Sequence, residues 1–171
     1  MPRRDDLETI MVLGSGPIKI GQAAEFDFSG SQAVRALRED GYKVILVNSN
    51  PATIQNDPEM ADIVYIEPLL PTTIAKILEK ERPCALLAGM GGQTALNIAS
   101  ELSHNGTLER LGVELIGSDL DAIDKAEDRE LFNKVCESIN LPISQAVACN
   151  SIDEVIAAAE LIGSWPILIR P

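Results

Sequence analysis

The run TIMVLGSGPIKIGQ at residues 9–22 opens an alternation of strand-like and helix-like segments that decides the fold class. Its first five residues are apolar and stop at Gly14, which is typical of a short buried strand that ends in a turn. Small residues in the turn allow its backbone N–H groups to face a ligand. A tight turn without a ligand explains the same residues equally well, so both interpretations stay open here.

Apolar runs and amphipathic segments alternate along the following hundred or so residues. Further strands are predicted at residues 43–47, 62–66, 84–88 and 113–116, and helices at 29–40, 71–82 and 93–104. Continuous apolar strands separated by amphipathic helices are typical of a parallel sheet that is covered on both faces. Residues 1 to about 120 are therefore predicted to form one doubly wound α/β domain, with ligands at the carboxyl ends of its strands.

The pattern changes after about residue 120. Helices are predicted at residues 127–140 and from the capping box SIDE at 151–154, and short strands at 145–148 and 166–170. A buried strand is an unusual place for a chain to stop, because its ladder and its covering layer would be missing. We therefore expect the chain to be a fragment that is cut just inside a second domain.

Composition and charge exclude several classes of function. The 171 residues include 14 Lys and Arg against 26 Asp and Glu, which gives a formal net charge of −12. A chain this acidic has no electrostatic attraction to nucleic acid or to an anionic membrane, and no apolar run reaches the roughly 18 residues of a membrane span. Three cysteines and one histidine are too few for a disulfide framework or a histidine zinc site. We expect a globular protein of a reducing compartment.

The first glycine turn departs from the dinucleotide-binding fingerprint. That fingerprint needs Gly-x-Gly-x-x-Gly running directly into a helix, whereas here the third glycine comes at Gly21. The SGSQ segment has capping-box spacing, so the helix is predicted only from about Ser29. The second strand ends at Asn48, without the acid that binds a ribose hydroxyl. A nicotinamide-dependent oxidoreductase is therefore a weak interpretation.

Two other segments each allow a binding role and a structural one. GMGGQT at residues 89–94 places three glycines before a predicted helix, where they could hold an anion or could allow close packing of the helix on its strand. NSNPAT at residues 48–53 is expected to cap backbone groups with its side chains. His104 is expected to end a helix rather than to act in catalysis.

Two arginines stand out by their positions. Arg129 lies in the first turn of a predicted helix, where the helix dipole favours acids, and Arg170 ends an otherwise apolar strand. Each could bind an anion or form a structural salt bridge, with Asp128 and Glu130 as candidate partners of Arg129.

Four segments together resemble the N-terminal signature of the carbamoyl-phosphate synthase large subunits, in the same order and spacing. These segments are LGSGPIKIGQAAEFDFSGSQA at residues 13–33, VILVNSNPATIQNDPEMADIVYIEP at 44–68, MGGQTALN at 90–97 and DAIDKAEDR at 121–129. The resemblance implies a Rossmann-like pre-ATP-grasp domain at residues 1–125. It further implies a linking helix and the truncated start of an ATP-grasp domain at residues 126–171.

The same resemblance implies an activity for the intact protein. In this family the first half of the subunit phosphorylates bicarbonate with ATP to carboxyphosphate, on the way to carbamoyl phosphate for arginine and pyrimidine biosynthesis. It implies a cytoplasmic ATP-dependent ligase that uses Mg²⁺ or Mn²⁺, ammonia from a glutaminase small subunit, and a higher oligomer. The family's metal ligands would follow residue 171, so the chain alone is expected to be inactive.

The resemblance assigns a role to the two arginines. Arg129 and Arg170 match nucleotide-contacting arginines of the family and are expected near the ATP phosphates. It implies no catalytic residue and no metal ligand within this chain. The alternative is a stand-alone Rossmann-like binding or assembly module without catalysis.

Overall fold

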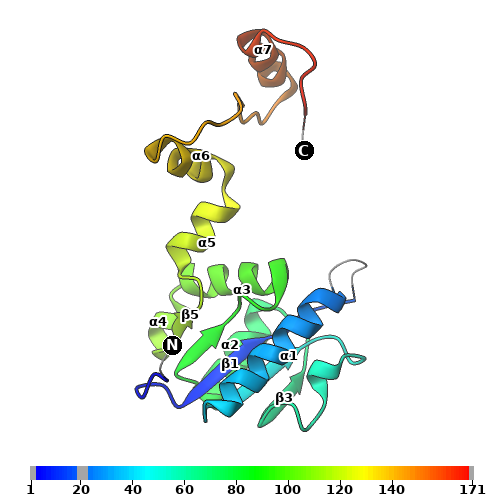
Figure 1. Ribbon diagram of the computed structural model, residues 1–171, viewed down its shortest axis with the longest axis vertical. Coiled ribbons are helices and arrows are strands. Elements are labelled where there is room, and N and C mark those ends of the chain that lie inside the picture. The colour runs from blue at the N-terminus through cyan, green and yellow to red at the C-terminus, as the bar shows by residue number, and fades with distance from the viewer. Residues whose placement is uncertain (1–2, 19–22, 170–171) are drawn as a thin grey trace. The chain divides into compact units, whose positions relative to one another are not determined.

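The computed structural model describes residues 3–18 and 23–169, which belong to two compact units, Met1–Ile123 and Asp124–Pro171 (Figure 1). The first unit contains a five-stranded sheet with the order β3-β2-β1-β4-β5. Its strands are β1 (Thr9–Leu13), β2 (Lys43–Asn48), β3 (Ile63–Ile66), β4 (Ala85–Leu87) and β5 (Glu114–Ile116). Every pairing is parallel, which confirms the predicted doubly wound α/β class.

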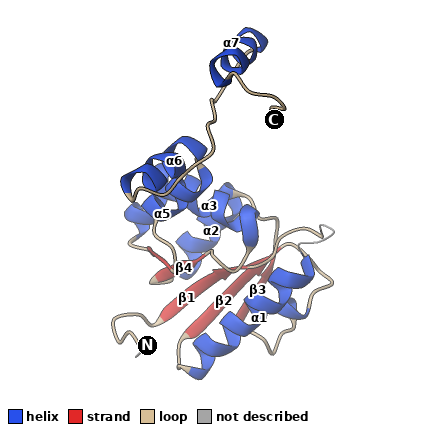
Figure 2. Ribbon diagram, turned by 45° about the horizontal axis from the view of Figure 1, so that its top comes forward, coloured by secondary structure: helices blue, strands red, loops and turns tan. Residues whose placement is uncertain are grey.

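Helices cover both faces of this sheet (Figure 2). They are α1 (Ala23–Glu39), α2 (Pro71–Glu81), α3 (Gly92–His104) and α4 (Thr107–Leu111), with a short 3₁₀ helix η1 (Ile54–Asn56) between β2 and β3. Ile10 and Val12 of β1 pack in one apolar cluster with Val34 of α1. The intervening Met11 and Leu13 pack on the opposite face with residues of α2 and α3. Successive side chains of a strand point to opposite faces, so a strand covered on both sides is apolar throughout.

The prediction that the first helix begins at Ser29 is wrong, because α1 already starts at Ala23. Ser29 donates its hydroxyl hydrogen bond to the carbonyl oxygen of Glu25 at 3.1 Å, and Ser31 donates to that of Asp27 at 2.7 Å. These are the bonds that serines form to the preceding turn in the interior of a helix. The capping-box spacing is therefore coincidental here.

The second unit contains helices among the described residues 124–169 but no strand. The helix predicted at 127–140 is not continuous. Helix α5 (Leu120–Glu127) ends before Asp128, and α6 (Arg129–Ser138) begins after it. Helix α7 (Ile152–Ile162) starts as predicted, with Ser151 accepting a hydrogen bond from the Glu154 N–H at 3.3 Å. The predicted strand at 145–148 is irregular instead, and so is the described part, 166–169, of the strand predicted at 166–170. An apolar segment becomes a strand only where a partner pairs with its backbone.

The described residues of the second unit form no apolar core of their own. Among its described residues only Cys136 and Ala158 are buried. Large apolar side chains are exposed instead, including Phe132 at 51%, Ile152 at 79% and Trp165 at 78%. Burial of apolar area is the main favourable contribution to folding, so this unit gains little of it.

We predict that backbone amide exchange differs sharply between the two units. The amides of β2 lie in the centre of a covered sheet, whereas those of residues 145–169 lie in a unit whose described residues form no core. Hydrogen exchange followed by mass spectrometry should show slow exchange at 44–47 and fast exchange at 167–169. Equally slow exchange in both segments of a monomeric sample would contradict this prediction.

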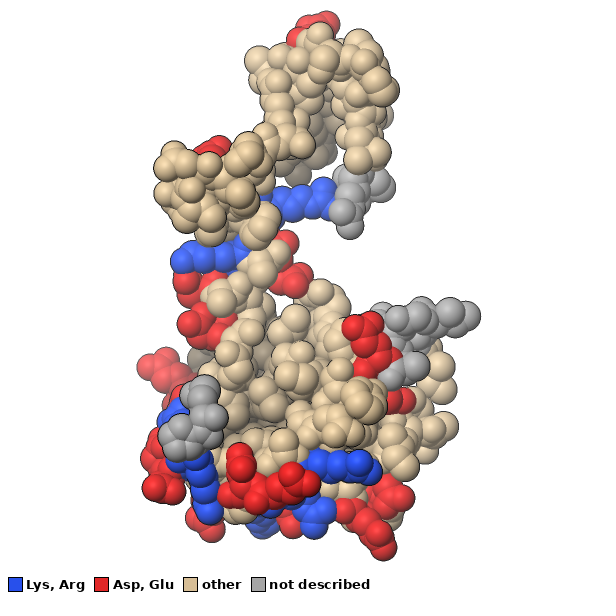
Figure 3. Space-filling model, viewed as in Figure 1, with Lys and Arg blue, Asp and Glu red and all other residues tan. Residues whose placement is uncertain are grey.

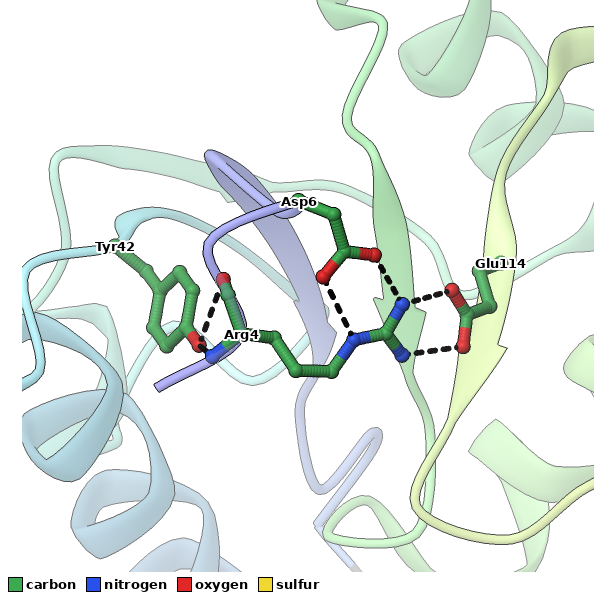
Figure 4. Close-up of polar contacts among 4 residues, drawn as sticks. All are labelled: Arg4, Asp6, Tyr42 and Glu114. Carbon is green, nitrogen blue, oxygen red and sulfur yellow. Dashed lines mark hydrogen bonds and ion pairs between the residues drawn. The ribbon is translucent and has the colours of Figure 1, made fainter. Parts of the chain in front are cut away.

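Arg4 ties the N-terminal segment to the amino edge of the sheet (Figure 4). Its guanidinium donates to both carboxylate oxygens of Glu114 in β5, at 2.6 and 2.9 Å, and to those of Asp6 at 2.5 and 3.1 Å. The Arg4 backbone N–H donates to the Tyr42 hydroxyl at 2.7 Å. Hydrogen bonding to Arg4 lowers the pKa of Asp6 and of Glu114, because the guanidinium stabilises each ionised carboxylate.

This cluster predicts a defined pH dependence of stability. The two carboxyls have lower pKa values in the folded chain than their ordinary values of 3.8 and 4.5. Their contribution to the free energy of unfolding is therefore present above about pH 4.5 and is lost as the pH falls through the lowered values. In the original chain the urea midpoint of unfolding should fall as the pH drops below about 4.5. In Arg4→Ala this fall should be smaller, because the ion pairs with Asp6 and Glu114 are already absent.

The matched control is Arg110→Ala, which removes an exposed pair with Glu79 at 2.9 Å without contact to Asp6 or Glu114. This variant should keep the acid sensitivity of the original chain. An equally small fall in both variants would show that general charge, rather than the Arg4 cluster, sets the pH dependence.

Candidate functional site

A polar cluster, buried except for the half-buried Asp27, lies where β1 and β2 end at the carboxyl edge of the sheet. Its side chains come from the turn after β1, from the end of β2, from η1 and from the first turns of α1. Its members are Ser15, Asp27, Asn48 and Gln55. Doubly wound folds bind their ligands at this edge, next to the strand where the order of connection reverses, which here is β1.

Asn48, the last residue of β2, is completely buried and connects the turn to the rest of the cluster. Its Oδ1 accepts a hydrogen bond from the Gly16 N–H at 2.9 Å. Its Nδ2 donates to Gln55 Oε1 at 3.2 Å and to Ser15 Oγ at 3.4 Å. The Asn48 side chain thus binds the Gly16 N–H, a backbone group of the kind that binds anions in such turns.

Gln55 in η1 is also completely buried, and its amide reaches the backbone of α1. Its Nε2 donates to the carbonyl oxygens of Phe26 at 2.7 Å and of Asp27 at 3.2 Å. A buried amide is costly unless its hydrogen bonds are made, and here both ends of the amide have partners. The Gln55 side chain therefore joins η1, β2 and α1.

Two glycines provide the space that Gln55 occupies. A Cβ atom at Gly14 would lie 2.6 Å from Gln55 Oε1 and 2.6 Å from Asn48 Cγ. A Cβ atom at Gly30 would lie 2.3 Å from Gln55 Nε2. These distances give a structural reason for glycine at both positions. For the turn that begins at Gly14, the sequence had left a ligand and a plain turn as alternatives. Lys19 and Gly21 of the same turn lie outside the described residues.

One of the glycines before α3, Gly91, serves close packing as well. A Cβ atom at Gly91 would lie 2.5 Å from the carbonyl oxygen of Gly14 and 2.7 Å from that of Leu13. The start of α3 therefore lies directly against the end of β1. Of the two roles left open by the sequence, this geometry supports close packing at Gly91.

The polar segment after β2 caps its own backbone, as predicted. Asn50 Oδ1 accepts from the Ala52 N–H at 3.0 Å, and Thr53 Oγ1 accepts from the Gln55 N–H at 3.2 Å. His104 ends α3, also as predicted, with its ring Nδ1 2.9 Å from the carbonyl oxygen of Ser100.

The described residues offer amide and hydroxyl groups but no set of metal ligands. Among them, no three His, Cys, Asp or Glu side chains come together in a way that could hold a metal ion. They therefore do not fit the Mg²⁺ or Mn²⁺ that the resemblance implies for the intact protein. No helix of the described chain is both long and apolar enough to cross a membrane.

The carboxyl edge of the sheet carries exposed apolar side chains, which we call the apolar rim. All end a strand, follow its carboxyl end or stand near the start of the next helix: Ile18, Phe28, Ile66, Leu70 and Met90. They are 37% to 69% exposed. Figure 3 shows charged side chains along the lower margin of the sheet-containing unit, on its left flank and at its upper right, and fewer across its middle. Apolar groups gathered at one edge are typical of a surface that another protein segment covers.

The two arginines predicted to bind ATP belong to the second unit. Arg129 is the first residue of α6, its side chain is exposed, and it forms no ion pair with any described residue. The candidate partner Asp128 instead caps the helix, accepting from the Leu131 N–H at 2.9 Å. Arg170 lies outside the described residues.

Sequence reasoning missed Gln55, which joins the cluster together. It interpreted Gly30 as part of a helix start and gave Gln55 no role. A signal was present, since a glycine in the middle of a helix costs stability and usually marks a close approach by another group.

Comparison with known proteins identifies relatives of the whole chain. The family model for the carbamoyl phosphate synthase preATP-grasp domain matches residues 6–125. The carbamoyl phosphate synthase large chain of Synechocystis sp. is 58% identical over all 171 residues, which make up 16% of that relative. The large chain, N-terminal section, of Aquifex aeolicus is 57% identical over the whole chain, which makes up 30% of it. The chain thus spans less than a third of the length of these relatives.

Solved structures show the same fold at low identity. The biotin carboxylase domain of a single-chain bacterial carboxylase matches with a TM-score of 0.67 and 13% identity, over 95% of this chain and 36% of that one. The biotin carboxylase domain of the Hydrogenobacter thermophilus 2-oxoglutarate carboxylase matches with a TM-score of 0.65 and 18% identity, over 92% and 33%. The family match and the identity over every residue show that the chain belongs to the carbamoyl phosphate synthase large-chain family and corresponds to its N-terminal region.

Proposed function

We propose that this chain is the N-terminal part of an ATP-dependent ligase whose first half phosphorylates bicarbonate to carboxyphosphate, on the way to carbamoyl phosphate. The observation that carries the proposal is 58% identity over all 171 residues to a carbamoyl phosphate synthase large chain. A stand-alone module is the less favoured alternative, because the relatives are several times longer than this chain. A glycine-rich loop encoded soon after residue 171 would support the ligase, and a stop codon there would support the module.

The proposal includes the substrates and partners of the intact enzyme. The substrates are ATP with Mg²⁺ or Mn²⁺, bicarbonate, and ammonia that a glutaminase small subunit releases from glutamine. The intact enzyme would form a higher oligomer in the cytoplasm and would serve arginine and pyrimidine biosynthesis. The Hydrogenobacter carboxylase domain of the same fold was solved with MgADP and bicarbonate, which supports related chemistry on this architecture.

We propose that residues 1–125 form the pre-ATP-grasp domain and residues 126–171 begin an ATP-grasp domain. Two observations support this division. The family model ends at residue 125, and the chain separates into compact units at Ile123 and Asp124. The exposed apolar side chains of the second unit would then be covered by the part of the longer protein that follows.

The apolar rim of the first unit supports the same proposal. Ligands of doubly wound folds bind beyond the carboxyl ends of the strands, and the apolar rim stands at that edge. The longer chain of the relatives supplies enough protein to cover it. In this arrangement the first unit supports an active site whose nucleotide-binding groups come from elsewhere.

Arg129 suits a role in binding phosphate. An arginine at the first position of a helix lies where the dipole disfavours a positive charge, and no described residue compensates it with an ion pair. An anionic ligand would compensate this charge. We propose that Arg129 and Arg170 stabilise the ATP phosphates of the first site, as arginines commonly do in phosphoryl transfer.

We predict that the purified 171-residue chain is inactive. Supplied with ATP, magnesium and bicarbonate, it should neither hydrolyse ATP nor form carbamoyl phosphate, because we place the metal ligands and the phosphate loop after residue 171. Phosphate release should equal that of a mock preparation from cells without the gene. Turnover above that control would contradict the prediction.

We predict a selective loss of activity when either arginine is replaced in the intact enzyme. Arg129→Ala and Arg170→Ala should each lower bicarbonate-dependent ATP hydrolysis, on the order of 10²-fold for a preorganised charge that stabilises the transition state. The partial reaction of the second half, ATP synthesis from ADP and carbamoyl phosphate, should continue at its normal rate.

Arg35→Ala is the matched control, because Arg35 is an exposed arginine on α1 of the first unit. It should leave both partial reactions unchanged. Equal loss of both reactions in the Arg129 and Arg170 variants would point to structural roles. So would a lowered melting temperature with normal bicarbonate-dependent hydrolysis.

A further inference from the structure

The Asn48 and Gln55 side chains lie where a nucleotide would be expected in a fold of this kind. In dinucleotide-binding folds the phosphates lie over the turn after β1, against backbone N–H groups and the start of the next helix. Here the Gly16 N–H donates to Asn48 Oδ1 at 2.9 Å. The space beside Gly14 and Gly30 contains the Gln55 amide.

We propose that the Asn48 and Gln55 amides act as an internal ligand of this turn, filling the phosphate position and closing it to nucleotides. An amide oxygen can accept the same N–H hydrogen bond as a phosphate oxygen without bringing a charge into a buried place. Both side chains are 0% exposed, so a nucleotide could reach the Gly16 N–H only by displacing the Asn48 amide. We call this pair the amide plug.

The charge next to the turn supports the proposal independently. Asp27 of α1 accepts a hydrogen bond from the Ser15 hydroxyl at 2.5 Å, which places a carboxylate directly beside the turn. A carboxylate repels a phosphate, and the effect is strong where little water screens it. None of the cluster's described members is a Lys or Arg. The four described side chains therefore bring none of the positive charge that phosphate sites use, and Lys19 of the same turn lies outside the described residues.

The amide plug also explains the glycine at position 30, far from the turn itself. Gly30 lies in the interior of α1, where alanine normally stabilises a helix relative to glycine. The three atoms nearest to an added Cβ are all atoms of Gln55, the closest at 2.3 Å. If the amide plug alone requires this glycine, removing Gln55 should remove the requirement.

The first experiment measures the effect of Gly30→Ala on the melting temperature in two backgrounds. In the original chain the substitution should lower the melting temperature by roughly 5 °C or more, because Gln55 must leave its partners. In the Gln55→Ala background the same substitution should raise it. Gly89→Ala, whose added Cβ meets nothing within 4 Å, is the control and should behave alike in both backgrounds. The same decrease for Gly30→Ala in both backgrounds would overturn the proposal.

The second experiment uses only the original chain and NMR. The Gln55 side-chain NH₂ protons should exchange with water at least ~10²-fold more slowly than those of Gln32, an exposed glutamine on α1. Adding ADP-ribose or NAD at millimolar concentration should leave the backbone amides of Gly14 and Gly16 unshifted. Fast exchange at Gln55, or saturable shifts at these glycines, would overturn the proposal. Neither readout involves catalysis, so the outcome is independent of the proposed function.

Discussion

The burial of β1 on both faces is the constraint on which the rest of the structure depends. Ile10 and Val12 pack toward α1, whereas Met11 and Leu13 pack toward α2 and α3. With β2 on one side and β4 on the other, the strand has no free edge either. Its polar surroundings are therefore confined to its two ends, where the chain enters and leaves the sheet. Each end accordingly has its own chemistry.

The two edges of the sheet differ in the charge and the burial of their polar side chains. At the amino edge, Arg4 joins Asp6 and Glu114 through exposed ion pairs, which keep their contact with water and need little desolvation. At the carboxyl edge, Asn48 and Gln55 are buried and neutral, and each makes its hydrogen bonds inside the protein. The apolar rim surrounds this second edge. These features suit an amino edge that faces solvent and a carboxyl edge that faces more protein.

Membership of the carbamoyl phosphate synthase large-chain family gives these features a context. In our proposal the nucleotide is bound by groups outside the first unit, among them Arg129 and Arg170. A Rossmann-like unit whose phosphate position is filled by its own side chains can then serve as a support for chemistry that takes place beyond it. Three glycines of this unit, Gly14, Gly30 and Gly91, serve internal packing, because a Cβ atom at each would lie 2.6 Å or less from another group.

The sequence by itself determined the fold class, the family and most of the elements of the first unit. Apolar runs such as residues 9–13 and 43–47 indicate strands covered on both faces, since local periodicity records which sides of a segment are buried. It also indicated correctly that NSNPAT caps its own backbone. These features depend on neighbours in the chain, which a sequence displays directly.

Only the tertiary structure decided the features that depend on distant residues. Gln55 meets Gly14 and Gly30, more than twenty residues away, and no local pattern reports the 2.3 Å approach that excludes a Cβ atom at position 30. The start of α1 at Ala23 was missed for a different, local reason, because Ser29 and Ser31 use their hydroxyls inside the helix rather than at its cap. No strand formed at 145–148 or in the described part, 166–169, of the segment predicted at 166–170, because a strand needs a partner as well as a suitable sequence. Residue type limits what a side chain can bind, but only the fold determines which group it meets.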